Sequence, residues 1–198
     1  KAADGIDKIS LSNTAQALTV DVGDVGDLVT ALTGTGYKGN VKVDGTTVIP
    51  VADLIALNDL TTGKITLNDA SLADTATYSE NAENLVKAFD GITGLKGDVT
   101  ISSAANTVTI AQLKAINKAT SGDITVTNNQ TLSGDAKDLI EALKDVTLTA
   151  ATTSTVKVTG AVTLAQILEL QKSVDANADL TFANTSAALT GTTADILA

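Results

Sequence analysis

Short segments in which apolar and polar residues alternate recur along the whole chain. Alternation with a period of two is typical of a strand that buries one face. Seven such segments begin at Ile9, Val41, Ile65, Val99, Ile124, Val156 and Leu180. We expect these seven positions to lie on neighbouring strands, in sequence order.

The segments between these strands have the apolar spacing of helices and fall into two families. The first opens three matching stretches, residues 51–69, 110–128 and 164–184, and "VTIAQLKAI" (108–116) closely resembles "VTLAQILEL" (162–170). The second is anchored on an aliphatic residue that recurs at intervals of 54 or 57 residues, at Leu28, Leu85, Leu139 and Ile196. Self-similarity with such a period is the signature of a repeat protein.

Polar residues mark the helix starts. Thr109 and Thr163 each stand three residues before a Gln, which predicts a capping box. Ser79, Ser133 and Thr190 are predicted to cap the second helix family. Residues 190–198 begin a further helix of that family, so we expect this end to expose apolar groups. The chain is then either a monomer or associates weakly end to end.

Strands that alternate with helices pair in parallel, because each helix carries the chain back to the start of the next strand. Strands that alternate apolar and polar residues bury only one face of their sheet. The sequence therefore predicts an α/β fold, a leucine-rich-repeat-like solenoid with one parallel sheet of about seven strands covered by helices on one face. Residues 1–198 form one solenoid domain of about three and a half repeats of 54–59 residues, which we expect to be a fragment of a longer array.

An amide or acid side chain follows the strand at one position of each long coil. The four residues are Asn13, Asp69, Asn128 and Asn184. Side chains stacked from coil to coil in this way can satisfy backbone groups at a bend. We favour such a ladder, and ordinary Asx turns are the alternative.

Composition argues against several classes of function. All 13 basic residues are lysines, against 23 acidic residues, and the net charge of −10 repels the phosphates of nucleic acid. The chain has no cysteine and no histidine, so it has no disulfide, no imidazole base and no Cys/His zinc site. No apolar run is long enough to span a bilayer, so we expect no membrane insertion. No carboxylate pair stands out for acid–base catalysis, and we expect no enzyme activity, cofactor or bound metal.

Two short motifs have ordinary explanations. "GTGYKG" (34–39) fits the dinucleotide-binding pattern, but it follows a predicted helix and precedes a predicted strand, which is the reverse of the required order. "DVGDVGD" (21–27) spaces its aspartates by three, whereas an EF-hand loop uses every second position. A helix stop followed by a turn explains the first motif, and acids in the first turn of a helix explain the second.

The units "LSGDAKDLIEAL" (132–143), "LTGTTADIL" (189–197) and "VTLAQILEL" (162–170) resemble the Thr/Ala/Asp-rich tandem units of very large secreted bacterial surface proteins of the adhesin or hemolysin type. The resemblance implies a noncatalytic structural or adhesive repeat segment, located at the cell surface or outside the cell and flanked by neighbouring repeats of the same array. The chain contains no Gly-Gly pair, so the calcium ligands of hemolysin-type repeats have no counterpart in it.

The strand face that the helices leave uncovered is the candidate binding surface. Its outward positions are Lys42, Thr66, Thr100, Thr125, Lys157 and Thr181. A binding module that docks a protein or glycan partner on this face is the alternative function, although threonine is also common on exposed strands generally. The two lysines interrupt the threonines and argue against the regular array that binding to ice requires.

Overall fold

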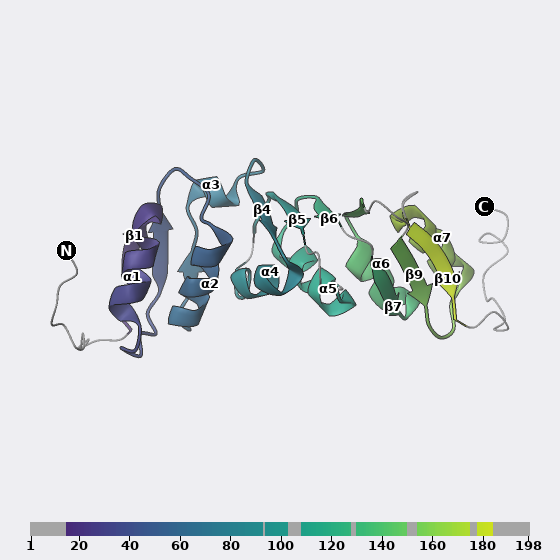
Figure 1. Cartoon of the computed structure of the whole chain (residues 1–198), viewed down its shortest axis with the longest axis horizontal. Coiled ribbons are helices and arrows are strands. Elements are labelled where there is room, and N and C mark those ends of the chain that lie inside the picture. The colour runs from purple at the N-terminus through teal and green to yellow at the C-terminus, as the bar shows by residue number, and fades with distance from the viewer. Residues whose placement is uncertain are drawn as a thin grey trace.

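The computed structural model of the chain describes residues 15–92, 94–102, 108–127, 130–149, 154–174 and 178–183. These residues form an elongated stack, with α1 (Val25–Leu32) at one end and β10 (Ala178–Phe182) at the other (Figure 1). Several sequence-based predictions lie outside the described residues, namely those for Ile9, Asn13, Asn128, Asn184 and residues 190–198.

Helices and strands alternate over most of the described chain. After the short 3-10 turn η1 (Val22–Asp24) and α1, the helices are α2 (Val51–Leu60), α3 (Asp69–Leu72), α4 (Ala82–Ala88), α5 (Ile110–Ala119), α6 (Ala136–Leu143) and α7 (Leu164–Ser173). The strands before β10 are β1 (Leu18–Asp21), β2 (Val41–Asp44), β3 (Ile65–Thr66), β4 (Thr77–Glu80), β5 (Asp98–Ile101), β6 (Ile124–Val126), β7 (Thr131–Gly134), β8 (Val146–Leu148) and β9 (Ser154–Val158). The sequence pattern does not predict β1, β4, β7 or β8.

All the strand pairs of the described chain are parallel, which confirms the α/β class with parallel sheets. The expectation of one continuous sheet is wrong, because the strands form three sheets, β1-β2-β3, β4-β5-β6-β8 and β7-β9-β10. The predicted neighbours that do pair are Val41 with Ile65, Val99 with Ile124, and Val156 with Leu180. Ile65 and Val99 belong to different sheets, as do Ile124 and Val156.

The sheet is interrupted where the connection between successive strands is short. Neighbouring parallel strands need a crossover of about a dozen residues or more, usually with a helix. The connection from β3 to β4 spans residues 67–76 and contains only the short helix α3, and that from β6 to β7 spans residues 127–130. Neither connection can return the chain to the start of a parallel neighbour, so β4 and β7 each begin a new sheet.

At the second interruption, two sheets share one crossover helix. β6 and β7 follow each other closely before α6, and β8 and β9 follow each other closely after it. β6 pairs with β8, and β7 pairs with β9. The helix α6 therefore serves both pairs, and β8 becomes the fourth strand of the second sheet.

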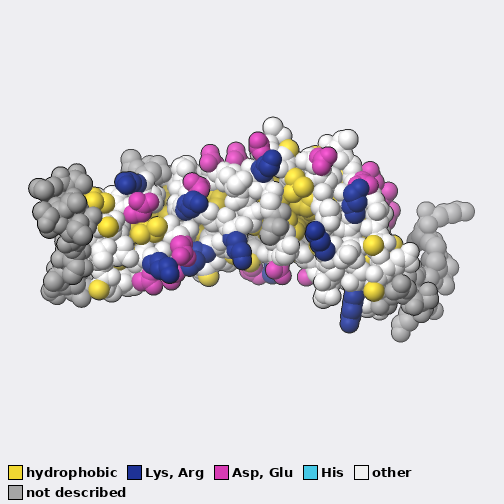
Figure 2. Space-filling model, turned by 180° about the vertical axis from the view of Figure 1, so that it is seen from behind, with side chains coloured by type: hydrophobic (Ala, Val, Ile, Leu, Met, Phe, Trp, Pro, Cys, Tyr) yellow, Lys and Arg dark blue, Asp and Glu magenta, His cyan; other side chains and the backbone are white. Residues whose placement is uncertain are grey.

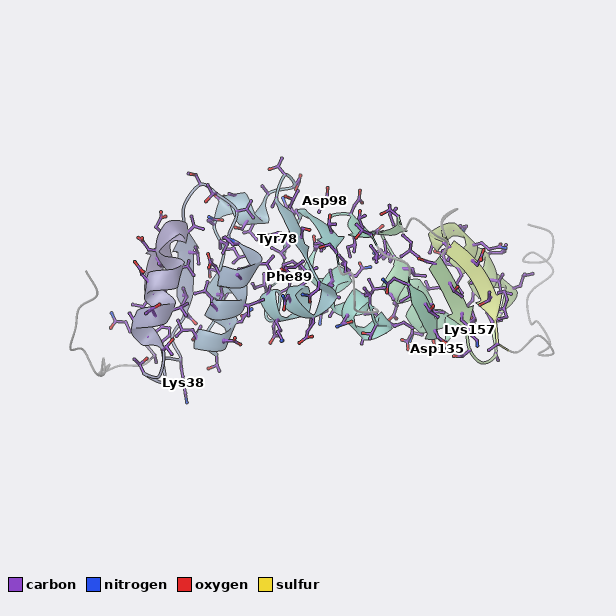
Figure 3. The ribbon with its side chains drawn as sticks, viewed as in Figure 1. Lys38, Tyr78, Phe89, Asp98, Asp135 and Lys157 are labelled. Carbon is purple, nitrogen blue, oxygen red and sulfur yellow. The ribbon has the colours of Figure 1, made fainter. Side chains whose placement is uncertain are left out.

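The helices form a continuous row along the stack. In order along the chain, α1, α2, α4, α5, α6 and α7 each contact the next (Figure 1). The inward residues of strands and helices share one hydrophobic core that extends through all three sheets. Within it, the rings of Tyr78 on β4 and Phe89 after α4 meet edge to face, with their centroids 5.3 Å apart (Figure 3). Continuity of the stack thus comes from the helix layer and the core beneath it.

The helix starts confirm one set of predicted caps and correct another. Thr109 of α5 and Thr163 of α7 each form the predicted capping box with the Gln three residues later. Ser79 and Ser133 are not caps, because they lie within β4 and β7. The residues that cap α4 and α6 are Asn81 and Asp135.

Side chains link successive coils. At Asp69, the one position of the predicted Asn ladder that the structure describes, the prediction is wrong. Asp69 is exposed in the first turn of α3. Its neighbour Asn68 is buried and donates from Nδ2 to the Thr47 carbonyl at 2.8 Å. Ser71 is also buried, and its Oγ accepts a hydrogen bond from the backbone N–H of Ile49 at 2.9 Å. Serine and a different asparagine therefore make the link at this bend.

Gln130 makes the corresponding link in the next unit. Its Oε1 accepts a hydrogen bond from the backbone N–H of Val108 at 2.7 Å. Its own backbone N–H donates to Ser154 Oγ at 3.1 Å. A chain of side-chain links thus joins three successive coils.

Glycines allow neighbouring coils to touch at the strand starts. Thr61 donates from Oγ1 to the Gly39 carbonyl at 2.7 Å, and Thr120 donates in the same way to the Gly97 carbonyl at 2.8 Å. Two residues after Thr120, a Cβ atom on Gly122 would lie 2.4 Å from the Gly97 carbonyl oxygen. Only glycine permits such an approach between two backbones.

We expect Gly122→Ala to lower the free energy of unfolding by about 1–3 kcal/mol, because the added methyl group forces two coils apart. Gly26→Ala is the matched control, since a Cβ on this residue of α1 meets nothing within 4 Å. That change should raise the free energy of unfolding by about 0.4–1 kcal/mol, because it restricts the unfolded chain. Urea titration monitored by circular dichroism measures both values. Equal stability of the two variants would contradict the close approach.

Candidate functional site

All six residues of the predicted binding face lie on strands and point away from the core. The four exposed residues are Lys42, Thr66, Lys157 and Thr181. The two half-buried residues are Thr100 and Thr125. Most residues that flank them on the same strands, such as Val41 and Val43, are buried, whereas Ile65, Leu180 and Phe182 are partly buried. The alternation in the sequence therefore predicts their orientation correctly.

These residues lie in three separate rows, one across each sheet, which we call the sheet rows. By strand register the rows are Thr19–Lys42–Thr66, Ser79–Thr100–Thr125–Thr147 and Ser133–Lys157–Thr181. In Figure 1, α1 stands in front of β1 at one end of the stack, whereas β9 and β10 face the viewer at the other. The three rows therefore do not form one flat field.

Four members of the sheet rows are missing from the sequence-based prediction. They are Thr19, Ser79, Ser133 and Thr147. Each lies on a strand of three or four residues. β4 and β7 hold one large apolar residue each, so their period-two signal is weak. β1 and β8 alternate as the predicted strands β2 and β6 do.

Some threonine hydroxyls near the sheet rows already donate to the neighbouring strand. Thr181 donates from Oγ1 to the Val156 carbonyl at 3.4 Å, and Thr127 donates to the Ile101 carbonyl at 3.2 Å. These hydroxyl groups help to join adjacent strands. Their oxygens keep lone pairs that can accept a hydrogen bond from a partner.

The two lysines of the sheet rows differ in their surroundings. Lys42 Nζ lies 2.6 Å from Asp44 Oδ1, and the two side chains are 57% and 48% exposed. Lys157 is exposed on β9 (Figure 3).

Figure 2 shows lysines scattered over the side opposite to that of Figure 1, with Asp and Glu mostly along its upper and lower margins. This side therefore carries lysines well spread among polar groups.

Two grooves open at equivalent places between helices. One, of about 490 Å³, is lined by residues of α1 and α2 that include Val29, Leu32 and Asp59. The other, of about 240 Å³, is lined by residues of α4 and α5 that include Val86 and Lys118. Their apolar walls correspond, but Asp59 stands where the other groove has Lys118. The second groove is also lined by Asp90, so the two grooves differ in charge and share no ligand chemistry, and we interpret both as gaps in helix packing.

The two glycine- and aspartate-containing motifs have the structural roles expected from the sequence. Gly34 and Gly36 have φ angles of 78° and 70° in the turn that follows α1. Asp21 caps η1 by accepting from the backbone N–H of Gly23 at 3.0 Å. Asp27 lies in the first turn of α1.

Within the described ranges, no group of three or more His, Cys, Asp or Glu side chains is arranged to hold a metal ion. None of the helices in that part of the chain has the length and apolar character needed to cross a bilayer.

An ionic contact joins α5 to α6. Lys114 Nζ lies 2.7 Å from Asp138 Oδ1 and 2.6 Å from Glu141 Oε2. The hydrogen bonds to Asp138 and Glu141 raise the pKa of Lys114 above its ordinary value. The same bond from Lys114 lowers the pKa of Asp138. The contact thus connects two units of the stack.

Comparison of the chain with protein-family models, with curated proteins and with solved structures gave no match. The function must therefore be inferred from the fold and the surface of the molecule itself.

We expect Asp138→Asn to lower the free energy of unfolding at neutral pH and to have no effect at strongly acidic pH. The pKa of Asp138 is lower in the folded protein than its ordinary value of 3.8, chiefly because its carboxylate accepts a hydrogen bond from Lys114. The carboxylate therefore stabilises the fold above that value, and the contribution disappears as the pH falls through the folded pKa. Urea titrations of both proteins between about pH 7 and about pH 2 measure the difference.

Lys114→Met provides the control for this pH dependence. In that background the partner of Asp138 on α5 is gone, so Asp138→Asn should have a much smaller effect at every pH. The free energies of unfolding of the wild-type protein and the Asp138→Asn variant are compared at each pH. If their difference stays constant down to acidic pH, the charge of Asp138 is not the cause of that difference.

Proposed function

We propose that the chain is a noncatalytic structural or adhesive repeat segment of a secreted bacterial cell-surface protein, built as a leucine-rich-repeat-like array. The observation that carries this proposal is that the same side-chain contacts join successive units at equivalent positions. The resemblance of the sequence to the tandem units of large secreted surface proteins supports the location at the cell surface.

The clearest of these contacts caps a helix of the following unit. Asn58 of α2 donates from Nδ2 to the carbonyls of Lys87 and Ala88 at the end of α4, both at 2.9 Å. Asn117, at the same position of α5, donates to the Lys144 carbonyl at the end of α6. The last carbonyls of a helix have no partner within it, so each asparagine completes a helix that belongs to the next unit.

Contacts of this kind suit a load-bearing rod. Each unit is stabilised by its neighbours in sequence, and the interface contributions add along the array. Lys114 adds an ionic contact across the same boundary between α5 and α6.

The alternative function is a binding module for a protein or glycan, and the sheet rows are the observation that favours it. They offer hydroxyl groups and the two exposed lysines Lys42 and Lys157. Contacts of this kind are individually weak, and a long array would strengthen them by presenting many at once.

We expect the double variant Asn58→Ala/Asn117→Ala to unfold at lower force than the wild-type protein when the chain is pulled by its two ends. Each change leaves helix carbonyls without their cap from the neighbouring unit, at about 0.5–1.5 kcal/mol per hydrogen bond. Single-molecule force spectroscopy measures the unfolding force. Asn84→Ala is the control, because Asn84 bonds to Glu80 within its own unit.

If the double variant and the control unfold at the same force as the wild-type chain, the contacts between units do not bear load. That result would count against the structural form of the proposal.

The binding alternative predicts that the chain attaches to cells or immobilised glycans through the sheet rows. Thr66→Ala/Thr100→Ala/Thr125→Ala should then reduce attachment while leaving the circular dichroism spectrum unchanged. Lys42→Gln/Lys157→Gln should reduce it as well if the lysines take part. The readout is attachment of fluorescently labelled protein.

The helix side provides the matched control for the lysines. Lys87 is paired with Glu83, as Lys42 is with Asp44, and Lys118 is exposed, as Lys157 is. Lys87→Gln/Lys118→Gln should therefore leave attachment unchanged. Attachment that survives all changes to the sheet rows would show that these rows are not the binding surface. If the wild-type chain attaches to nothing, the binding alternative is excluded and only the structural role remains.

A further inference from the structure

The end of the stack formed by α7 and β10 leaves apolar side chains partly uncovered. Ile167 on α7 and Leu180 and Phe182 on β10 are only partly buried. α5 and β6 are their counterparts one unit earlier, since α5 and α7 start with the same capping box. The equivalent residues there are 0–1% exposed, and they are Leu113, Ile124 and Val126.

In the earlier unit, residues 131–141, which form β7 and most of α6, cover α5, whereas the second edge of β6 is covered by its partner strand β8. Leu132 of β7 is 1% exposed and Leu139 of α6 is 0% exposed. Both elements contact α5. Gly134 approaches so closely that a Cβ atom on it would lie 2.5 Å from Ile110 Cδ1. The cover thus has aliphatic residues at two positions and a glycine at a third.

Residues 188–198, which lie outside the described part of the chain, repeat this cover in sequence. "ALTGTTADILA" aligns with "TLSGDAKDLIE" (131–141) without a gap. Leu189 stands at the position of Leu132, Gly191 at that of Gly134, Asp195 at that of Asp138 and Ile196 at that of Leu139. The position of Ile110, which Gly134 approaches, is held by Leu164 at the start of α7.

The connection to this segment also has a suitable length. Residues 183–187 separate β10 from residue 188, and residues 127–130 separate β6 from β7. A connection of this length is too short for a parallel crossover but sufficient to begin a new sheet, as it does at β7.

We propose that the α7 side of the end formed by α7 and β10 is a docking surface and that residues 188–198 of the same chain occupy it as residues 131–141 occupy α5. Docking buries Leu189 and Ile196 against α7, including Ile167. With this segment in place, the α7 side of the surface is closed to a second copy of the chain. The inference rests on the repeated surface and sequence and holds for either of the proposed functions.

A nitroxide label at position 195 tests this placement, because the chain has no cysteine of its own. The variant Asp195→Cys carrying the label should reduce the peak intensities of backbone amides in α7 of the same molecule. Asp138→Cys is the internal reference, since Asp138 contacts Lys114 of α5 and its label must reduce the amide intensities of that helix. The measurement is the ratio of intensities with the nitroxide oxidised and reduced.

Two further variants keep the test decisive. Ile196→Asp should restore the α7 intensities by preventing burial, whereas Thr192→Asp, which adds the same charge at the position of the exposed Asp135, should not. Ala194→Cys, at the position of the exposed Lys137, serves as a second labelling site if Asp195→Cys disturbs the segment. A sample that mixes labelled chains with isotope-enriched unlabelled chains detects docking onto a second copy. Intensity loss only in that mixture, or no loss on α7 at all, would overturn the proposal.

Discussion

A parallel strand can pair with its predecessor only if the chain first travels back along the sheet, and the architecture depends on this requirement. Where a full helix lies between two strands, as from β2 to β3 or from β5 to β6, the strands become neighbours. Where the connection is short, one sheet ends and another begins. Helices need no such return to pack side by side, so their row remains continuous across every interruption of the sheet layer.

Side chains supply acceptors at the bends where the coils follow one another without strand pairing. Ser71 Oγ accepts the N–H of Ile49, and Gln130 Oε1 accepts the N–H of Val108. Both donor residues are buried, at 0% and 3% exposure, and an unpaired buried N–H would cost about 1–3 kcal/mol. Ser71 in the short helix α3 and Gln130 in the connection before β7 each bring a side-chain oxygen to a backbone N–H of the preceding coil. Units of different sequence can therefore keep one geometry.

The sequence predicts the elements with strong local signals and misses those without them. Thr109 and Thr163 mark two helix starts because a capping box uses residues at fixed spacing. β4 and β7 have one large apolar residue each, Tyr78 and Leu132, so their sequences show no alternation of apolar and polar residues. Without these strands, the segments on either side look like successive neighbours, and three sheets merge into one. The alternation of apolar and polar residues is enough to predict which side chains of the binding face point outward. Its division into three rows could not be predicted, because it depends on the strands that the sequence pattern misses.

The division into rows limits what the strand face can recognise. The second row contains only hydroxyl side chains, and the lysine of the first row is paired with Asp44. A partner that meets one unit therefore gains a few hydroxyl contacts and at most one uncompensated ammonium group. Contacts of that number give weak binding, since exposed polar groups exchange one set of hydrogen bonds with water for another. An adhesive role consequently requires many units acting together, whereas a structural role requires only the contacts between units that Asn58 and Asn117 already make.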